Sequence, residues 1–169
     1  FMASLAWYTF GYCGELVSST MPAMPGWNIF QYIGVCFMPY LWIRLTATYV
    51  HASFINRIRF KAVLIAACLV TLFGAATDPW LSLRYVSVSV IREFGFPVLS
   101  FTRGPLYYFH IAYSAVAFTV GTVLLFNSLL SSGTLYRKQL LLMLSGSCIP
   151  WINYMLYVAG VTIPGIDSN

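Results

Sequence analysis

The stretch TRGPLYYFHIAYSAVAFTVGTVLLF, residues Thr102–Phe126, decides the fold of this chain. It begins with the polar start Arg103-Gly104-Pro105 and continues without a charge for about twenty apolar residues, the length that crosses the ~30 Å hydrocarbon core of a bilayer. Pro105 suits the first turn of a helix, where its missing N–H costs no hydrogen bond. The stretch therefore predicts a membrane-spanning helix that ends at Asn127-Ser128.

The composition of the whole chain also indicates a membrane protein. Of the 169 residues, 60% are hydrophobic and 8% are charged, whereas soluble domains carry roughly 25% charged residues. The net charge is +5, but the basic residues lie in short segments between apolar runs, which is typical of membrane proteins. We therefore expect the lipid bilayer, and not a nucleic acid, to surround this chain.

Other apolar runs predict further helices. We expect them at about Met2–Val17, Trp27–Tyr49, Ala62–Ala76 and Leu140–Gly160. Thr77-Asp78-Pro79 is expected to end the third of these. Pro39 and Pro150 lie inside two of the helices, where a proline removes one helical hydrogen bond. They are hinge candidates, and a static kink that aids packing is an equal alternative.

Residues 81–102 depart from the helical pattern. The sequence RYVSVSVIREFGFPVLSF alternates polar and apolar residues, is rich in β-branched side chains and has a turn signal around Gly95. It predicts a two-stranded hairpin outside the bilayer. The expected fold is an all-α integral membrane bundle of about five transmembrane helices with a small extracytoplasmic β-hairpin. Residues 1–169 form one domain, and the hairpin is an insertion within it.

The charge distribution predicts the orientation in the membrane. Five basic residues and no acids occupy the 50–61 and 131–138 segments, so the positive-inside rule places both segments in the cytoplasm. The opposite side mixes both signs. Five crossings then leave the N-terminus of this chain inside and Asn169 outside. The charged residues of the mixed side are Glu15, Asp78, Arg84, Arg92, Glu93 and Arg103.

Several motifs together resemble the seven-helix N-terminal sensor region of bacterial histidine kinases, which also occurs on diguanylate cyclases. They are GYCGELV (11–17), QYIGVCFMPYLWIRLTATY (31–49), TDPW (77–80), RGPLYYFHIAYS (103–114), LYRKQLLLMLSGSCIPWINYMLY (135–157) and PGID (164–167). The resemblance implies that the chain is a fragment covering helices two to six of seven. Family members often carry a His shortly after the fourth helix, where this chain has Trp80 and Leu81, so no role is carried over to that position.

Polar residues near the predicted outer membrane level form the candidate ligand site. Ionisable groups in a bilayer usually face a bundle interior and pair with one another, and aromatic walls with a few convergent polar groups suit a small amphipathic ligand. The candidates are Glu15, Trp27, Gln31, Asp78, Arg103, Tyr107, His110 and Asn153, with Tyr12, Tyr108 and Trp151 as further wall residues.

Two structural alternatives to a ligand site stay open. Glu15 and Arg103 could form an interfacial ion pair that only fixes the register of the helices. His110 could be a core histidine whose ring is hydrogen-bonded to a neighbouring helix.

The sequence contains no recognisable catalytic or cofactor-binding constellation. His51 and His110 lie at different predicted depths and cannot share a haem. A retinal Schiff base needs a buried lysine, but Lys61 and Lys138 lie in the predicted cytoplasmic loops. We expect no enzyme activity, cofactor or metal within these residues. The cysteines lack metal-site spacing, and we expect buried free thiols at Cys13, Cys36, Cys68 and Cys148.

The resemblance implies a sensory input module in the bacterial inner membrane. Such a module binds a small extracytoplasmic ligand or senses the membrane, and it controls a cytoplasmic histidine kinase or diguanylate cyclase output domain, working as a homodimer. The alternative is an accessory subunit of a membrane complex or a transporter. A transporter predicts an inverted repeat and charges near the midplane, neither of which the sequence shows.

Overall fold

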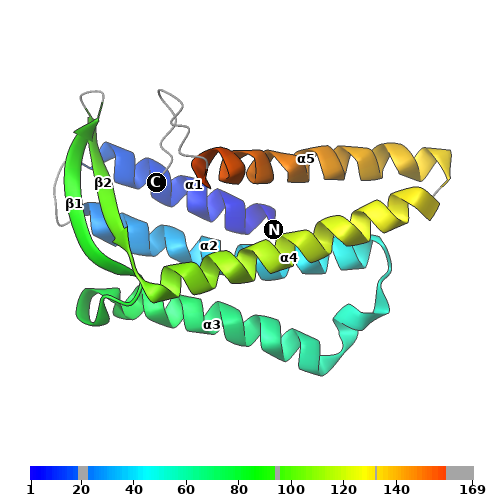
Figure 1. Ribbon diagram of the computed structural model, residues 1–169, viewed down its shortest axis with the longest axis horizontal. Coiled ribbons are helices and arrows are strands. Elements are labelled where there is room, and N and C mark those ends of the chain that lie inside the picture. Colours follow the sequence, from blue (N-terminus) through cyan, green and yellow to red (C-terminus); the bar gives the residue numbers. More distant parts are fainter. Residues whose placement is uncertain (19–22, 94–95, 132, 159–169) are drawn as a thin grey trace.

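The computed structural model describes residues 1–18, 23–93, 96–131 and 133–158. Its helices lie along the long axis of the molecule, and a two-stranded hairpin stands across one end (Figure 1). A short 3-10 helix, η1, precedes α3, and the hairpin lies between α3 and α4 in the chain. The elements are α1 (Met2–Val17), α2 (Ala23–Tyr49), η1 (Ser53–Asn56), α3 (Ile58–Leu81), β1 (Tyr85–Glu93), β2 (Phe96–Arg103), α4 (Pro105–Ser131) and α5 (Thr134–Val158).

The ends of α3 differ from the prediction. The helix already begins at Ile58 and runs through Thr77-Asp78-Pro79 to Leu81, so this proline does not stop it. The helix ends because Ser82 adopts a left-handed conformation (φ 47°) and donates its N–H to the carbonyl oxygen of Asp78 at 2.9 Å. Asp78 therefore lies in the last turn of a helix that is longer than predicted.

The start of the last helix also differs. Because α5 begins at Thr134, Arg137 and Lys138 lie in its first turns and not in a loop. Long basic side chains are good helix formers, so a basic run between two apolar runs does not mark a loop. By contrast, α1 has its predicted bounds, and α4 begins at Pro105 as predicted but continues to Ser131.

The core lies where α2 meets α3, α4 and α5. One cluster joins the C-terminal half of α2 to η1, α3 and α4, and a second joins α2 to α4 and α5. The first consists of Ile43, Ala47, Ile55, Leu64 and Ala117, and the second of Trp42, Leu125, Leu129 and Leu140.

Large apolar side chains also cover the outside of the helices. Val63, Phe73 and Val116 are between 63% and 68% exposed, and exposed apolar surface on this scale marks a membrane or partner surface. Among the described residues, Ile58–Asp78 and Pro105–Ser131 are long and apolar enough to cross a membrane.

Small residues let α1 and α2 approach closely. Ser4 Oγ donates to the carbonyl oxygen of Gly34 at 2.5 Å, and Trp7 Nε1 donates to that of Phe30 at 2.9 Å. A Cβ on Gly34 would lie 2.7 Å from the carbonyl oxygen of Ser4. Backbone contact of this kind is typical of helix pairs in membranes, where close packing replaces the hydrophobic driving force.

The hairpin is joined directly to the start of α4. Its strands are antiparallel, with Val88 opposite Phe101, and the predicted turn around Gly95 lies outside the described residues. Gly104 N–H donates to the carbonyl oxygen of Arg84 at 2.7 Å, and a Cβ on Gly104 would meet that same carbonyl at 2.9 Å. A residue without a side chain is therefore required where the hairpin enters α4.

Candidate functional site

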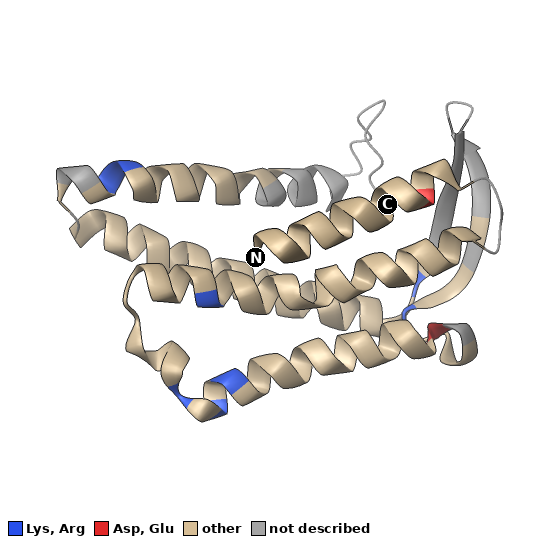
Figure 2. Cartoon of the chain, turned by 180° about the vertical axis from the view of Figure 1, so that it is seen from behind, with Lys and Arg blue, Asp and Glu red and all other residues tan. Residues whose placement is uncertain are grey.

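The charged residues are unevenly distributed along the bundle. The acidic residues of the helices lie near the hairpin, whereas most of the basic residues lie toward the other end (Figure 2). The C-terminal ends of α1 and α3 and the N-terminal ends of α2 and α4 meet at the hairpin end (Figure 1). Most of the predicted site residues are therefore brought to one end of the molecule.

A buried ion pair lies at this end. Arg84 Nε donates to Asp78 Oδ2 at 3.3 Å, and the two side chains are only 3% and 9% exposed. Asp78 Oδ1 also accepts the backbone N–H groups of Arg84 at 2.8 Å and Tyr85 at 3.2 Å. The Asp78 carboxylate thus fixes the position of the Arg84 guanidinium and also the backbone that leads from α3 into β1.

The guanidinium of Arg84 lies between two aromatic rings. Its Cζ is 4.3 Å from the ring centroid of Tyr32 on α2 and 4.3 Å from that of Tyr85 on β1. A desolvated contact of this kind contributes about 2 kcal/mol. Burial raises the pKa of Tyr85 to about 12, even though the nearby Arg84 charge acts to lower it. The phenol is therefore neutral at physiological pH, and Arg84 is held by Asp78 and by two ring faces.

His110 adds α4 to this arrangement. Its side chain is 6% exposed, and its ring centroid is 5.5 Å from that of Tyr32. Its Nε2 lies 3.4 Å from Ser114 Oγ, one turn further along α4. Within the described residues the hydrogen-bonding contact of His110 thus lies in its own helix, and the alternative of a histidine bonded to a neighbouring helix stays open. We call Tyr32, Asp78, Arg84, Tyr85 and His110 the polar cluster.

Two buried nitrogens of the polar cluster have no hydrogen-bond partner in the described part of the chain. They are Arg84 Nη1 and His110 Nδ1. Buried polar atoms are nearly always hydrogen-bonded in folded proteins, and leaving one unpaired costs about 1–3 kcal/mol. The two atoms are therefore candidates for contact with a water molecule or a ligand.

Glu15 and Gln31 form a second buried polar contact at the same end. Gln31 Nε2 donates to Glu15 Oε2, and the two residues are 5% and 9% exposed respectively. Gly11 on α1 lies directly against Gln31 and has no side chain, so α1 and α2 approach closely at this contact. The predicted ion pair between Glu15 and Arg103 stays a prediction.

The remaining predicted site residues occupy several different positions. Arg103 Cζ lies 5.5 Å from the ring centroid of Tyr107, and that ring is 6.2 Å from the ring of Tyr85, next to the polar cluster. Trp27 instead covers Gly14 and stacks edge-on against Phe10 and Phe30, between α1 and α2. Tyr108 is exposed. The side chains of Asn153, Pro150 and Trp151 lie outside the described residues.

Three residues of the polar cluster, Arg84, Tyr32 and Tyr85, are not among the predicted site residues. The sequence places Arg84 among the charges of the predicted outer side, whereas it is one of the most buried polar side chains described. The available signal was an arginine placed six residues after an acidic helix terminus, which lets the two side chains meet across the turn.

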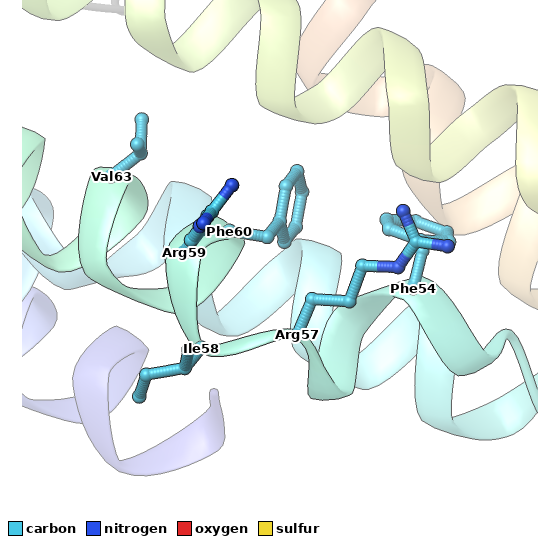
Figure 3. A pocket seen from close by; sticks show the side chains of 6 residues that line it. All are labelled: Phe54, Arg57, Ile58, Arg59, Phe60 and Val63. Atoms are coloured by element: carbon cyan, nitrogen blue, oxygen red, sulfur yellow. The ribbon is translucent and has the colours of Figure 1, made fainter.

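The opposite end of the bundle carries a hollow with a volume of about 670 Å³. It is formed where η1 meets the start of α3 (Figure 3). It is lined by Phe54, Arg57, Ile58, Arg59, Phe60 and Val63.

The cysteines follow the prediction only in part. Cys36 and Cys68 are buried free thiols as expected, whereas Cys13 and Cys148 are exposed on the outside of their helices. Apolar runs of a membrane helix do not distinguish the side that faces the bundle from the side that faces lipid. Within the described residues, no group of three His, Cys, Asp or Glu side chains could hold a metal ion.

Fold and site together define a helical membrane protein with a buried charged cluster at one end of its bundle. The family model of the N-terminal 7TM region of histidine kinase matches residues 1–169, and the chain belongs to this family. It is thus a transmembrane sensory region, a non-catalytic input region. No curated protein and no solved structure matches the chain.

Proposed function

We propose that this region is the input module of a bacterial receptor that binds a small extracytoplasmic ligand at the polar cluster and controls a cytoplasmic output domain. The proposal rests on the buried Asp78–Arg84 ion pair, which joins α3 to the start of β1. The guanidinium of Arg84 lies over the ring of Tyr32 on α2, and that ring lies beside His110 of α4. A ligand that changes the position of Arg84 would act on three helices and the hairpin at once.

The chemistry of the cluster favours a ligand that carries hydrogen-bond acceptors. Arg84 Nη1 is always a donor, and His110 Nδ1 donates in one of its two neutral tautomers. Tyr32 and Tyr85 provide apolar ring faces next to these donors. A small molecule with a carboxylate or carbonyl group and a short apolar part matches this set of groups.

The proposed topology has five membrane crossings, with the hairpin outside the bacterial inner membrane. The N-terminus of the chain is then cytoplasmic and its C-terminus extracytoplasmic. The uneven distribution of charges along the bundle supports this orientation, since basic residues favour the cytoplasmic side.

The proposed signal is a population shift between two arrangements of the packed helices, passed to the output domain across a homodimer. Pro39 is fully buried inside α2, between the polar cluster and the basic end, and is a proposed hinge together with Pro150. The output domain is a histidine kinase or, as in related architectures, a diguanylate cyclase.

The test is the basal output of the full-length receptor in lipid vesicles. Arg84→Met removes the charge and keeps an apolar side chain of similar length, and Val116→Ala on the exposed side of α4 is the matched control. We expect Arg84→Met to change phosphoryl transfer or cyclic dinucleotide synthesis about fivefold or more, the range of typical coupling between sites. Unchanged output from a fully inserted Arg84→Met receptor would contradict the proposal and favour an accessory subunit of a membrane complex.

A further inference from the structure

The hollow at the basic end combines two cations with an apolar floor. Arg57 and Arg59 are exposed, whereas Phe54 and Phe60 are half-buried with their ring centroids 5.1 Å apart. Both rings pack against the core cluster of Ile43, Ala47, Ile55, Leu64 and Ala117. The floor of the hollow is therefore fixed by the core of the bundle.

The side chains of the hollow have a common direction. In the close view, Arg57, Arg59, Phe60 and Val63 extend to one side of the chain, whereas Ile58 extends to the other (Figure 3). Val63 is 68% exposed and lies one turn into α3, where the membrane-crossing stretch Ile58–Asp78 has begun. In the same view (Figure 3) the guanidinium group of Arg57 lies toward Phe54 and that of Arg59 toward Val63, with the ring of Phe60 between them, so the hollow has a cation on each side of an apolar floor.

Within the described residues, the acidic side chains of the helices lie near the hairpin, at the other end of the bundle from these guanidinium groups (Figure 2). The sequence has no Asp or Glu between residues 16 and 77, nor between residues 94 and 166. The start of α3 also has no side-chain cap, and the N-terminal end of a helix carries a partial positive charge. An anion that contacts Arg57 and Arg59 therefore does not come from the described helices.

We propose that this hollow binds the headgroup of an anionic phospholipid. The phosphate lies between Arg57 and Arg59, whose planar guanidinium groups match phosphate oxygens, and the glycerol and first acyl carbons lie on Phe60 and Val63. A phospholipid in the surrounding leaflet contacts the arginines and the apolar side chains of the hollow at the same time, because its charged headgroup is joined directly to its apolar chains. The site is separate from the polar cluster and does not depend on a ligand there.

The test is native mass spectrometry of the full-length receptor in detergent, titrated with palmitoyl-oleoyl phosphatidylglycerol and, separately, with the phosphatidylcholine of the same chains. We expect the wild-type receptor to bind phosphatidylglycerol more tightly than phosphatidylcholine. The double variant Arg57→Gln/Arg59→Gln should weaken phosphatidylglycerol binding about thirtyfold. This factor is about 2 kcal/mol, from about 1 kcal/mol per basic residue near an anionic surface and 1.4 kcal/mol per tenfold change.

Two further variants distinguish a specific lipid site from general attraction by charge. Arg137→Gln/Lys138→Gln removes the same charge from the start of α5 and should leave the affinity nearly unchanged. Arg57→Lys/Arg59→Lys keeps the charge that directs membrane insertion but loses the guanidinium fork, and should give an intermediate affinity. Equal weakening by both Gln double variants would overturn the site in favour of general attraction between a basic surface and anionic lipid. Displacement of the lipid by millimolar inorganic phosphate would overturn the lipid as occupant.

Discussion

Removing the carboxylate of Asp78 is the sharpest perturbation of the polar cluster. Arg84 is 3% exposed and forms an ion pair with Asp78. Removing one partner of a buried pair costs about 3–5 kcal/mol, because a charge is left buried without compensation. The two tyrosine rings still face the guanidinium in Asp78→Ala, so we expect the lower end of this range, about 3 kcal/mol. For a chain of this size that lowers the unfolding temperature by about 6–12 °C.

Thermal unfolding of the purified region in detergent measures this effect. The reaction of the buried thiols of Cys36 and Cys68 with a maleimide dye reports unfolding, on a background in which Cys13 and Cys148 are Ser. Thr77→Ala is the control, since Thr77 bonds only within its own helix, to the carbonyl oxygens of Phe73 and Gly74.

A series of variants separates the two roles of Asp78. Asp78→Asn keeps an oxygen for the N–H groups of Arg84 and Tyr85 and should fall between wild type and Asp78→Ala. Asp78→Asn/Arg84→Met leaves no buried charge within the polar cluster itself and should be more stable than Asp78→Asn alone. The reasoning is refuted if Asp78→Ala unfolds at the same temperature as Thr77→Ala.

Two other predictions concern packing and pH. Gly34→Ala should destabilise the region by about 1–3 kcal/mol, because its Cβ would lie 2.7 Å from the carbonyl oxygen of Ser4. Gly26→Ala is the control: a Cβ there meets nothing within 4 Å, so this variant should be neutral or stabilised by up to about 1 kcal/mol. Equal unfolding temperatures for the two variants would contradict the close contact at Gly34. Burial raises the pKa of Tyr85 to about 12, above its ordinary value of about 10, so its contribution to stability is present below pH 10 and is lost between pH 10 and 12. Unfolding measured against pH should show a smaller loss in this window for Tyr85→Phe, and identical profiles would count against a buried phenol.

Apolar length and polar start signals were sufficient to predict most helices. The bounds of α1 and the start of α4 at Pro105 follow from local chemistry that no distant contact overrides. The end of α3 could not be predicted in this way, since it depends on the left-handed conformation of Ser82 and not on Pro79. A proline in the last turn of a helix is tolerated when the neighbouring residues keep the backbone helical.

The contacts of the candidate site do not follow from the sequence. Glu15, Asp78 and His110 belong to α1, α3 and α4, and the hairpin ends of these helices meet only in the folded chain (Figure 1). The partner of Asp78 could not be chosen from the sequence, because several arginines lie on the same predicted side. The burial of Arg84 depends on the rings of Tyr32 and Tyr85, which meet only in the folded chain.

The most direct test of the account is whether the polar cluster and the basic end of the bundle are coupled. Spin labels at Ile58 and Leu130, exposed residues at the basic ends of α3 and α4, would report their distance by pulsed electron resonance. The sample is the full-length receptor in nanodiscs, with its native cysteines replaced by Ala. We expect Arg84→Met to change the relative populations in the distance distribution, whereas Val116→Ala should leave them unchanged. The same distribution in the wild type and in Arg84→Met would contradict coupling between the two ends.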